Sequence, residues 1–174
     1  MKQNILFICL SLLVMISYSQ ETTGQYLHKN HYMGFNAGAL TGIGFSYRYM
    51  PKKIGVQLTG LPIGNKHNLR IKAALTVFYK YYSSVGETLN LLAYASSSFV
   101  HKRDEIYYGI QPYEKHFIFE PQYINKYNAG IGTAMEIRLH NILSLDILLG
   151  YGIYDFTDNY RFTIDGGIGL FFRL

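Results

Sequence analysis

The feature that most constrains the fold is an alternation of side-chain character with a period of two residues. In a β-strand, successive side chains point to opposite sides, so such an alternation predicts a strand whose two faces meet different surroundings. Residues 128–139 give the clearest example. One face carries Ala129, Ile131, Thr133, Met135, Ile137 and Leu139, and the other carries Asn128, Gly130, Gly132, Ala134, Glu136 and Arg138.

Eight segments with this alternation follow one another, which predicts an all-β chain of eight antiparallel strands. Abundant Tyr (17), Phe (11) and Gly (17) beside only 4 Pro suit strands joined by tight turns. Adjacent Leu91 and Leu92 leave open which residues of the fifth segment face which side. The segments are residues 33–39, 42–50, 54–60, 69–82, 89–99, 128–139, 143–154 and 161–174.

The connections between these segments alternate in length, as in membrane barrels with short periplasmic turns and longer external loops. His140 and Asn141 are predicted to form one of the short turns. Residues 100–126 are the longest connection, with an irregular pattern of charges, tyrosines and prolines. We expect a long external loop there, either as a solvated extension of two strands or as a binding loop.

The positions of the glycines indicate which face of the strands points inward. Four pairs of glycines, on four of the segments, fall on the polar face, where a closed barrel of about eight strands has room only for small side chains. This predicts an up-and-down transmembrane barrel with its apolar face toward lipid. The Gly-x-Gly pairs lack the context and full spacing of a phosphate-binding loop. The predicted luminal glycines are Gly42, Gly44, Gly130, Gly132, Gly150, Gly152, Gly167 and Gly169.

The first residues have the layout of a secretory leader. Lys2 precedes an apolar stretch over residues 5–18, which is short of the roughly 20 residues that a spanning helix needs. We predict a cleaved signal peptide over residues 1–19, a periplasmic segment over 20–32 and the barrel over 33–174, with an uncleaved anchor as the alternative. The single cysteine, Cys9, lies in this leader, so the mature chain has no thiol for catalysis or metal binding.

The chain ends in GLFFRL, with Gly169, Phe172 and Leu174 in a spacing that resembles the terminal assembly signature of outer-membrane barrels. Leu174 stands where an aromatic residue is typical. Together with segments such as YNAGIGTAMEIRL and LLGYGIYD, the chain resembles the small OmpA/OmpX-like barrels and uncharacterised outer-membrane β-barrel proteins of this size. The resemblance implies location in the outer membrane of a Gram-negative-type envelope, with membrane lipid and the barrel-assembly machinery as partners. It carries over no catalytic residue.

Charged side chains on the predicted inner face fall near the periplasmic end if the N-terminus is periplasmic. Because an unpaired buried charge is costly, we expect them to pair as an ionic plug around Glu136 and Asp146, below a glycine-lined cleft. The alternative is a narrow gated pore. The predicted luminal charges are Arg48, Lys80, Glu136, Arg138, Asp146 and Arg173.

No catalytic, cofactor-binding or metal-ligating constellation is found in the sequence. His101 follows Ser96, Ser97 and Ser98, but no motif supplies an orienting acid, and the histidines lack metal-ligand spacing. A formal net charge of +5, spread along the chain, does not suggest nucleic acid.

Three function classes follow. The first is a non-enzymatic barrel with a plugged lumen that has a structural role or binds an unidentified partner at its long external loop. The second is a lipid-modifying outer-membrane enzyme. The third is a soluble secreted barrel that binds an apolar ligand.

Overall fold

The computed structural model describes residues 30–64, 69–108, 118–156 and 160–174, and the predicted leader and most of the predicted periplasmic segment lie outside them. The described residues form one closed antiparallel barrel of eight strands in sequence order, which confirms the predicted fold class. The strands are β1 (His31–Gly38), β2 (Gly42–Tyr49), β3 (Ile54–Gly64), β4 (Leu69–Ser83), β5 (Leu89–Tyr108), β6 (Ile118–His140), β7 (Leu143–Tyr154) and β8 (Arg161–Arg173).

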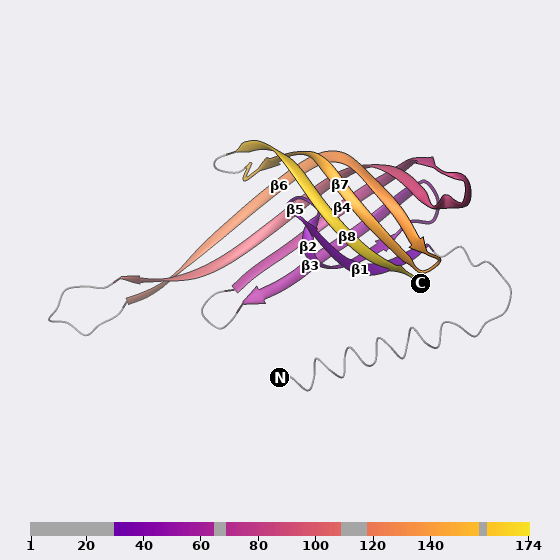
Figure 1. The fold of residues 1–174 in the computed structure, drawn as a ribbon. Coiled ribbons are helices and arrows are strands. Elements are labelled where there is room, and N and C mark those ends of the chain that lie inside the picture. Colours follow the sequence, from indigo (N-terminus) through magenta and orange to yellow (C-terminus); the bar gives the residue numbers. More distant parts are fainter. Residues whose placement is uncertain (1–29, 65–68, 109–117, 157–159) are drawn as a thin grey trace, which may run out of the picture.

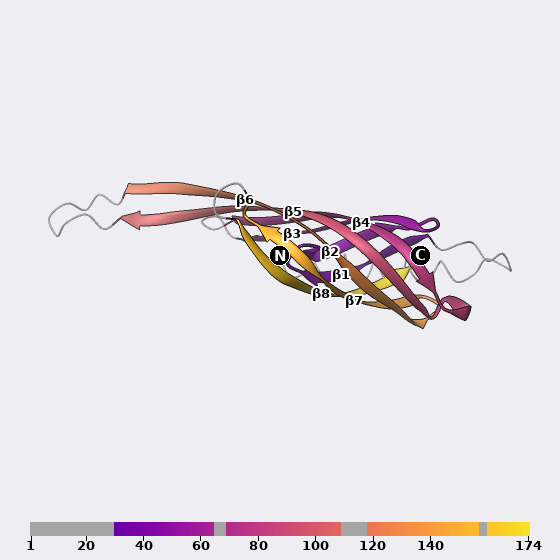
Figure 2. The same cartoon turned by 90° about the horizontal axis from the view of Figure 1, so that it is seen from above.

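The barrel closes between its first and last strands, where Ala37 lies opposite Ile168 and Met33 opposite Phe172. Figure 1 shows the strands wrapping around a common axis, and Figure 2 shows the same barrel from above. The chain enters β1 and leaves β8 at the same end, where the Leu174 amide donates to the His31 carbonyl at 2.8 Å. We call this the terminal end and the opposite end the outer end. Within the described residues, no helix has the length and apolar character to cross a bilayer.

Apolar side chains point outward from the barrel, as the alternation predicts. Phe45 on β2, Leu149 on β7 and Phe162 on β8 are 58%, 61% and 72% exposed. The intervening residues of the same strands, such as Ser46, Arg48 and Asp146, are buried in the lumen. In β5, Leu92 is buried and Leu91 is not, which settles the parity of that strand. This arrangement is the reverse of a soluble barrel, which buries its apolar face in the lumen.

The outward apolar face has the height of a bilayer core. On β4 it runs from Ile71 to Tyr81, about 33 Å along the strand at the usual rise, or about 25 Å along the barrel axis at a typical tilt. Exposed rings gather at both ends of this band, as in the aromatic girdles of membrane barrels. They are Tyr47, Tyr49, Tyr79, Tyr81 and Tyr82 toward the terminal end, and Tyr123, Tyr127, Tyr151, Tyr160 and Phe162 toward the outer end.

The stretch predicted as a long irregular loop is largely strand. β5 and β6 pair as far as Tyr108 and Ile118, so the connection outside the described residues is only 109–117. β4 pairs with β5 only as far as Arg103, and β7 pairs with β6 only from Ala129 onward. Beyond these points the two strands form a ribbon, which projects from the barrel in Figure 1. We call residues 104–108 and 118–122 the β5–β6 ribbon.

Two boundaries differ slightly from those that the sequence predicts. β1 begins at His31, so the first strand takes in the last two residues of the predicted periplasmic segment. β6 continues to His140, and the turn to β7 consists of Asn141 and Ile142. The register shifts between Arg138 and His140, which absorbs the one-residue difference without changing the faces of β7.

Candidate functional site

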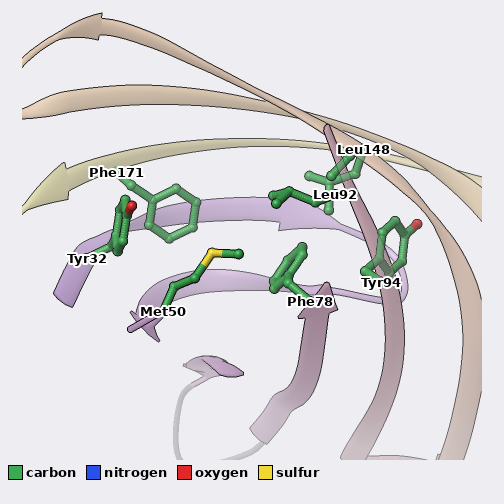
Figure 3. Close-up of a cluster of buried hydrophobic side chains, with 8 residues drawn as sticks. Tyr32, Met50, Phe78, Leu92, Tyr94, Leu148 and Phe171 are labelled. Atoms are coloured by element: carbon green, nitrogen blue, oxygen red, sulfur yellow. The ribbon is translucent and has the colours of Figure 1, made fainter. Parts of the chain in front are cut away.

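The lumen is filled by a small hydrophobic core that the polar pattern of the inner face does not predict. Leu148 and Phe171, which break the inner-face pattern in β7 and β8, belong to it and are 2% and 0% exposed. Figure 3 shows these side chains converging from several strands inside the barrel. The core consists of Tyr32, Met50, Phe78, Leu92, Tyr94, Ala134, Leu148 and Phe171.

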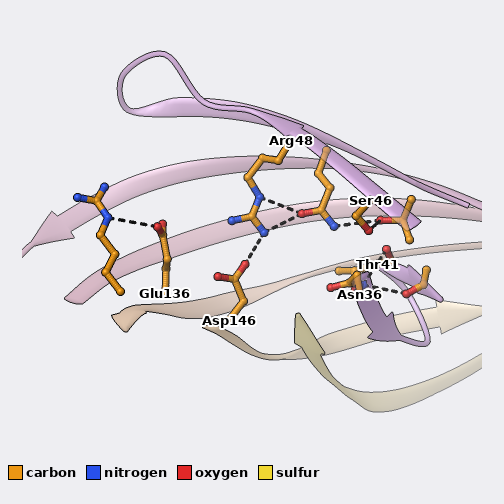
Figure 4. Close-up of polar contacts among 10 residues, drawn as sticks. Asn36, Thr41, Ser46, Arg48, Glu136 and Asp146 are labelled. Carbon is orange, nitrogen blue, oxygen red and sulfur yellow. Dashed lines mark hydrogen bonds and ion pairs between the residues drawn. The ribbon is translucent and has the colours of Figure 1, made fainter. Parts of the chain in front are cut away.

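Arg48 lies in the lumen toward the terminal end, opposite Tyr32 in the ladder, and is fully buried. Its Nη2 donates to Asp146 Oδ2, and its Nε and Nη2 donate to Gln57 Oε1 at 2.9 and 2.7 Å (Figure 4). The guanidinium carbon also lies 4.3 Å from the ring centre of Phe171 and 4.4 Å from that of Phe78. Two aromatic faces, one carboxylate and one amide therefore compensate for part of the water that Arg48 loses.

A second group of charges lies nearer the terminal end. Glu136 is fully buried opposite Asp146 in the ladder, and its Oε1 lies 3.6 Å from Arg138 Nε. Arg138 also donates through Nη1 to Glu87, in the short 3-10 turn Val85–Glu87 between β4 and β5. That hydrogen bond lowers the pKa of the Glu87 carboxyl below its ordinary value. Arg138 thus joins the buried carboxylate of the lumen to the exposed turn between β4 and β5.

The two remaining predicted charges, Lys80 and Arg173, are also on the inner face at the terminal end. The Arg173 guanidinium carbon lies 5.4 Å from the ring centre of Tyr32. Lys80 is half-buried, and among the described residues it makes no ion pair, although its positive charge helps to lower the pKa of Glu87. Of the six predicted charges, the structure thus joins Arg48 to Asp146 and Arg138 to Glu136.

The predicted luminal glycines lie on the inner face, but they do not line an open cleft. Gly130 pairs with Gly152, and Gly132 with Gly150, making a patch without side chains across β6 and β7. A Cβ on Gly130 would lie 2.3 Å from Leu40 Cδ1, and one on Gly150 would lie 2.5 Å from the Tyr94 hydroxyl. Leu40 and Tyr94 therefore occupy the space that the glycines leave.

Leu40 reaches that position because the β1–β2 turn folds into the barrel. Leu40 and Thr41 are both fully buried. The side-chain nitrogen Nδ2 of Asn36 donates to the Thr41 hydroxyl at 2.9 Å and to the Gly42 backbone carbonyl at 2.8 Å. The Ser96 hydroxyl donates to the Leu40 backbone carbonyl at 3.0 Å. The turn is thus held against both its own strand and β5. We call Leu40 and Thr41 the turn plug.

The serines near His101 are not arranged as a catalytic group. Ser96 faces the lumen and contacts Thr76 and Leu40, and Ser98 accepts from the Asn128 amide at 3.0 Å. Ser97 shares the outward face with His101, but four residues along a strand separate them by about 13 Å. His101 Nδ1 instead lies 2.7 Å from Asn125 Oδ1. Among the described residues, no three His, Cys, Asp or Glu side chains are grouped to hold a metal ion.

Sequence reasoning missed three kinds of residue in and around the lumen. Gln57 was detectable, because it alternates with the outward-facing Ile54, Val56 and Leu58 and so falls on the inner face of β3. Glu87 and Leu40 were not, because they lie in turns, where no period assigns a side chain to a face. The inward aromatic rings were visible only as exceptions to the alternation.

Known proteins add little beyond the architecture. No family model and no curated protein matches the chain. Among solved structures, the chain is similar to the N-terminal β-barrel domain of Pseudomonas aeruginosa OprF, with 13% identity and a TM-score of 0.45, over 82% of this chain and 95% of that one. A likeness this distant says nothing about function, so the fold assignment rests on strand pairing and side-chain placement.

Strand pairing and side-chain placement lead to the same assignment. The chain has the fold of a small outer-membrane β-barrel. Its lumen holds paired charges, aromatic rings and a folded-in turn, and its outer wall is apolar.

Proposed function

We propose that this protein is an outer-membrane barrel with a closed lumen and a structural, non-enzymatic role in the envelope. Its outward apolar band matches the roughly 25 Å height that lipid requires of such a wall. Membrane lipid and the assembly machinery that reads Gly169, Phe172 and Leu174 are then its first partners. Leu170 and Phe172 on β8, and Leu174 directly after it, are exposed and accessible for such recognition.

The observation that supports closure is that every strand sends a buried side chain into the lumen. A continuous aqueous path would have to pass between these side chains. Opening such a path would separate buried charges from their partners and leave a cavity, and both changes cost free energy. None of them is more than 2% exposed. In strand order they are Tyr32, Arg48, Gln57, Phe78, Leu92, Glu136, Asp146 and Phe171.

Membrane fractionation combined with electrophoresis of unheated and boiled samples tests the membrane barrel. We expect the protein in the outer-membrane fraction, with a mobility that changes on boiling, because a folded barrel resists detergent. Recovery from the soluble periplasm, with no mobility change, would favour a secreted ligand-binding barrel instead.

Planar-bilayer recording of the refolded protein tests closure. The wild type and Glu136→Ala should both give no conductance steps, because in both proteins Arg48 and the side chains around it still fill the lumen. Regular steps from the wild type would support the narrow gated pore, and steps from the variant alone would place the gate at Glu136.

A second candidate role is recognition of a surface partner by the β5–β6 ribbon. Its two strands pair only with each other beyond the barrel, so backbone groups along both outer edges lack a strand partner among the described residues. Such edges can accept a further strand from another chain. Replacing residues 104–122 by a short Asn-Gly turn should abolish partner capture while leaving the heat-dependent mobility unchanged.

The lipid-modifying role has less support. Ser96 and Ser98 face the lumen, and Ser97 is too far from His101 for proton transfer. Ser96→Ala, Ser97→Ala and Ser98→Ala should therefore leave the lipid profile of cells unchanged, and a changed profile in any one of them would revive the enzyme.

A further inference from the structure

A cavity of about 370 Å³ opens at the outer end of the lumen, above the turn plug. Its volume lies in the range of small-molecule sites. Ala39 of the β1–β2 turn contributes to its lining, and the next residue, Leu40, is buried against Gly130 and Gly152. The cavity is therefore a cup that ends on the turn plug. Its lining residues include Arg70, Lys72, Lys126, Asn128, Asp155 and Arg161.

The charges of this lining are strongly unbalanced. Four cations and one carboxylate give a formal excess of three positive charges. The single carboxylate, Asp155, already accepts from Lys126 Nζ. Among the described residues, neither Arg70, Lys72 nor Arg161 has a carboxylate within ion-pair distance.

Strand register gathers these cations from three sides of the cup. Lys72 on β4 lies opposite Val100 of β5, which in turn lies opposite Lys126 of β6. The two lysines are therefore two strands apart, about 10 Å between backbones, with side chains on the same inner face. Arg161 enters from β8 opposite Tyr154. Long cationic side chains spaced in this way can converge on one small group.

Part of the polar wall of the cup is held in place by hydrogen bonds within the barrel. The Asn128 side-chain oxygen Oδ1 accepts from the Asp155 backbone amide at 3.0 Å, and the Tyr154 hydroxyl donates to Asp165 Oδ1 at 3.0 Å. Asp155 also pairs with Lys126 and is only 16% exposed. These lining residues are thus held in place, and Arg70, Lys72 and Arg161 remain available to a ligand.

We propose that this cup is a binding site for a phosphate-type multivalent oxyanion, held by Arg70, Lys72 and Arg161. An anion would relieve the repulsion among these cations, and guanidinium groups match the geometry of phosphate oxygens. The inference goes beyond the structural role proposed above, because a closed lumen does not require a cationic cup. The phosphate can belong to a soluble molecule or to a lipid headgroup.

Isothermal titration of inorganic pyrophosphate into the refolded barrel in neutral detergent micelles tests the proposal. The wild type should bind with saturation at one site. Lys72→Gln combined with Arg161→Gln should weaken binding at least tenfold, because two charge-assisted contacts are lost. The heat-dependent mobility of the variant checks that it remains folded.

The matched control removes the same charge at the other end of the barrel. Lys52 and Lys53 lie in the exposed β2–β3 turn, and Lys52→Gln combined with Lys53→Gln should keep the affinity within about twofold. Equal weakening in both double variants would mean diffuse attraction and would overturn the proposal. So would a wild type that takes up no pyrophosphate.

A competition experiment identifies the source of the phosphate. If micelles doped with phosphatidic acid displace pyrophosphate from the wild type, the natural ligand is a lipid headgroup. If they do not, and a sugar phosphate does, the ligand is soluble. If neither displaces it, the cup accepts the free diphosphate but no phosphate monoester, and the proposal that its ligand is a phosphorylated molecule or lipid is wrong.

Discussion

The two ends of the lumen hold similar cations in opposite situations. At the terminal end, Arg48 is fully buried, paired with Asp146 and sandwiched between the rings of Phe78 and Phe171. At the outer end, Arg70 and Arg161 are exposed and line a cavity. One end is a packed interior and the other is an open cup, although both are built on the inner faces of the same strands.

The difference follows from how far each end is removed from water. A guanidinium that has lost its water needs a full set of partners, so the Arg48 neighbourhood is constrained by stability. A hydrated cation costs little without a partner and keeps its capacity to bind. The terminal end should therefore be sensitive to substitution in folding, and the outer end in binding.

The largest expected effect comes from breaking the central ion pair. Asp146→Ala leaves Arg48 buried without its carboxylate, which should reduce the free energy of unfolding by about 3 to 5 kcal/mol. Urea unfolding in lipid vesicles, followed by tyrosine fluorescence, measures this loss. The double variant Arg48→Met and Asp146→Leu should recover part of it, because no charge is then buried. A single variant as stable as the wild type would mean that water reaches this layer.

The glycine patch should give the next largest effect. A Cβ at Gly132 would meet the Leu149 carbonyl oxygen at 2.4 Å and Gly150 Cα at 2.7 Å, which are backbone atoms with little freedom to move. Gly132→Ala should thus cost about 1 to 3 kcal/mol in the same urea experiment. Gly166→Ala is the control, since its Cβ would meet nothing nearer than 3.8 Å. Similar losses in both variants would contradict the packing of Tyr94 against the patch.

A smaller, pH-dependent effect is expected where the lumen meets the Val85–Glu87 turn. Because Arg138 lowers the pKa of Glu87 in the folded state, the pair stabilises the protein above the ordinary glutamate pKa near 4.5. This contribution is lost as pH falls through the lower folded-state pKa. Glu87 is 54% exposed, so Glu87→Gln should cost less than about 0.5 kcal/mol at pH 7. Urea titrations across this pH range should show the difference vanishing in acid, and a constant difference would argue against the pair.

The smallest effect on stability is expected at the outer end. Arg161→Gln should change the free energy of unfolding by less than about 0.5 kcal/mol, because its side chain is exposed and has no ion pair among the described residues. The same urea titration checks this. A loss comparable to that of Asp146→Ala would erase the distinction between the packed end and the open cup.

The sequence predicted the barrel well because its outer wall is repetitive. On β7 the outward residues Ile147, Leu149 and Tyr151 are apolar in turn, and lipid favours the same pattern on the outward face of the other strands. The inner face obeys no such rule, since an interior must be filled by whatever fits. Glu136 and Asp146 could be expected to need partners. That Arg48 is the partner of Asp146 could not be predicted, because it depends on how the strands are placed relative to one another.

The turns and the ribbon were the least predictable parts. Leu40 is an apolar residue in a turn, and only the three-dimensional space above Gly130 and Gly152 explains its burial. The irregular sequence of the β5–β6 ribbon gave no alternation, because beyond the barrel its two faces no longer separate lipid from lumen. The cationic cup joins residues from β4, β6 and β8 that are distant in sequence.

The central claim is that the outward face meets lipid while the inward face is packed. Because Cys9 is the only cysteine, single cysteines placed along β7 in a Cys9→Ser background can be labelled with a fluorophore without interference. Quenching by bromine-labelled lipid in vesicles should be strong at Ile147→Cys and Leu149→Cys and weak at Leu148→Cys and Gly150→Cys. Uniform quenching along the strand, or strong quenching at the inward positions alone, would contradict the account.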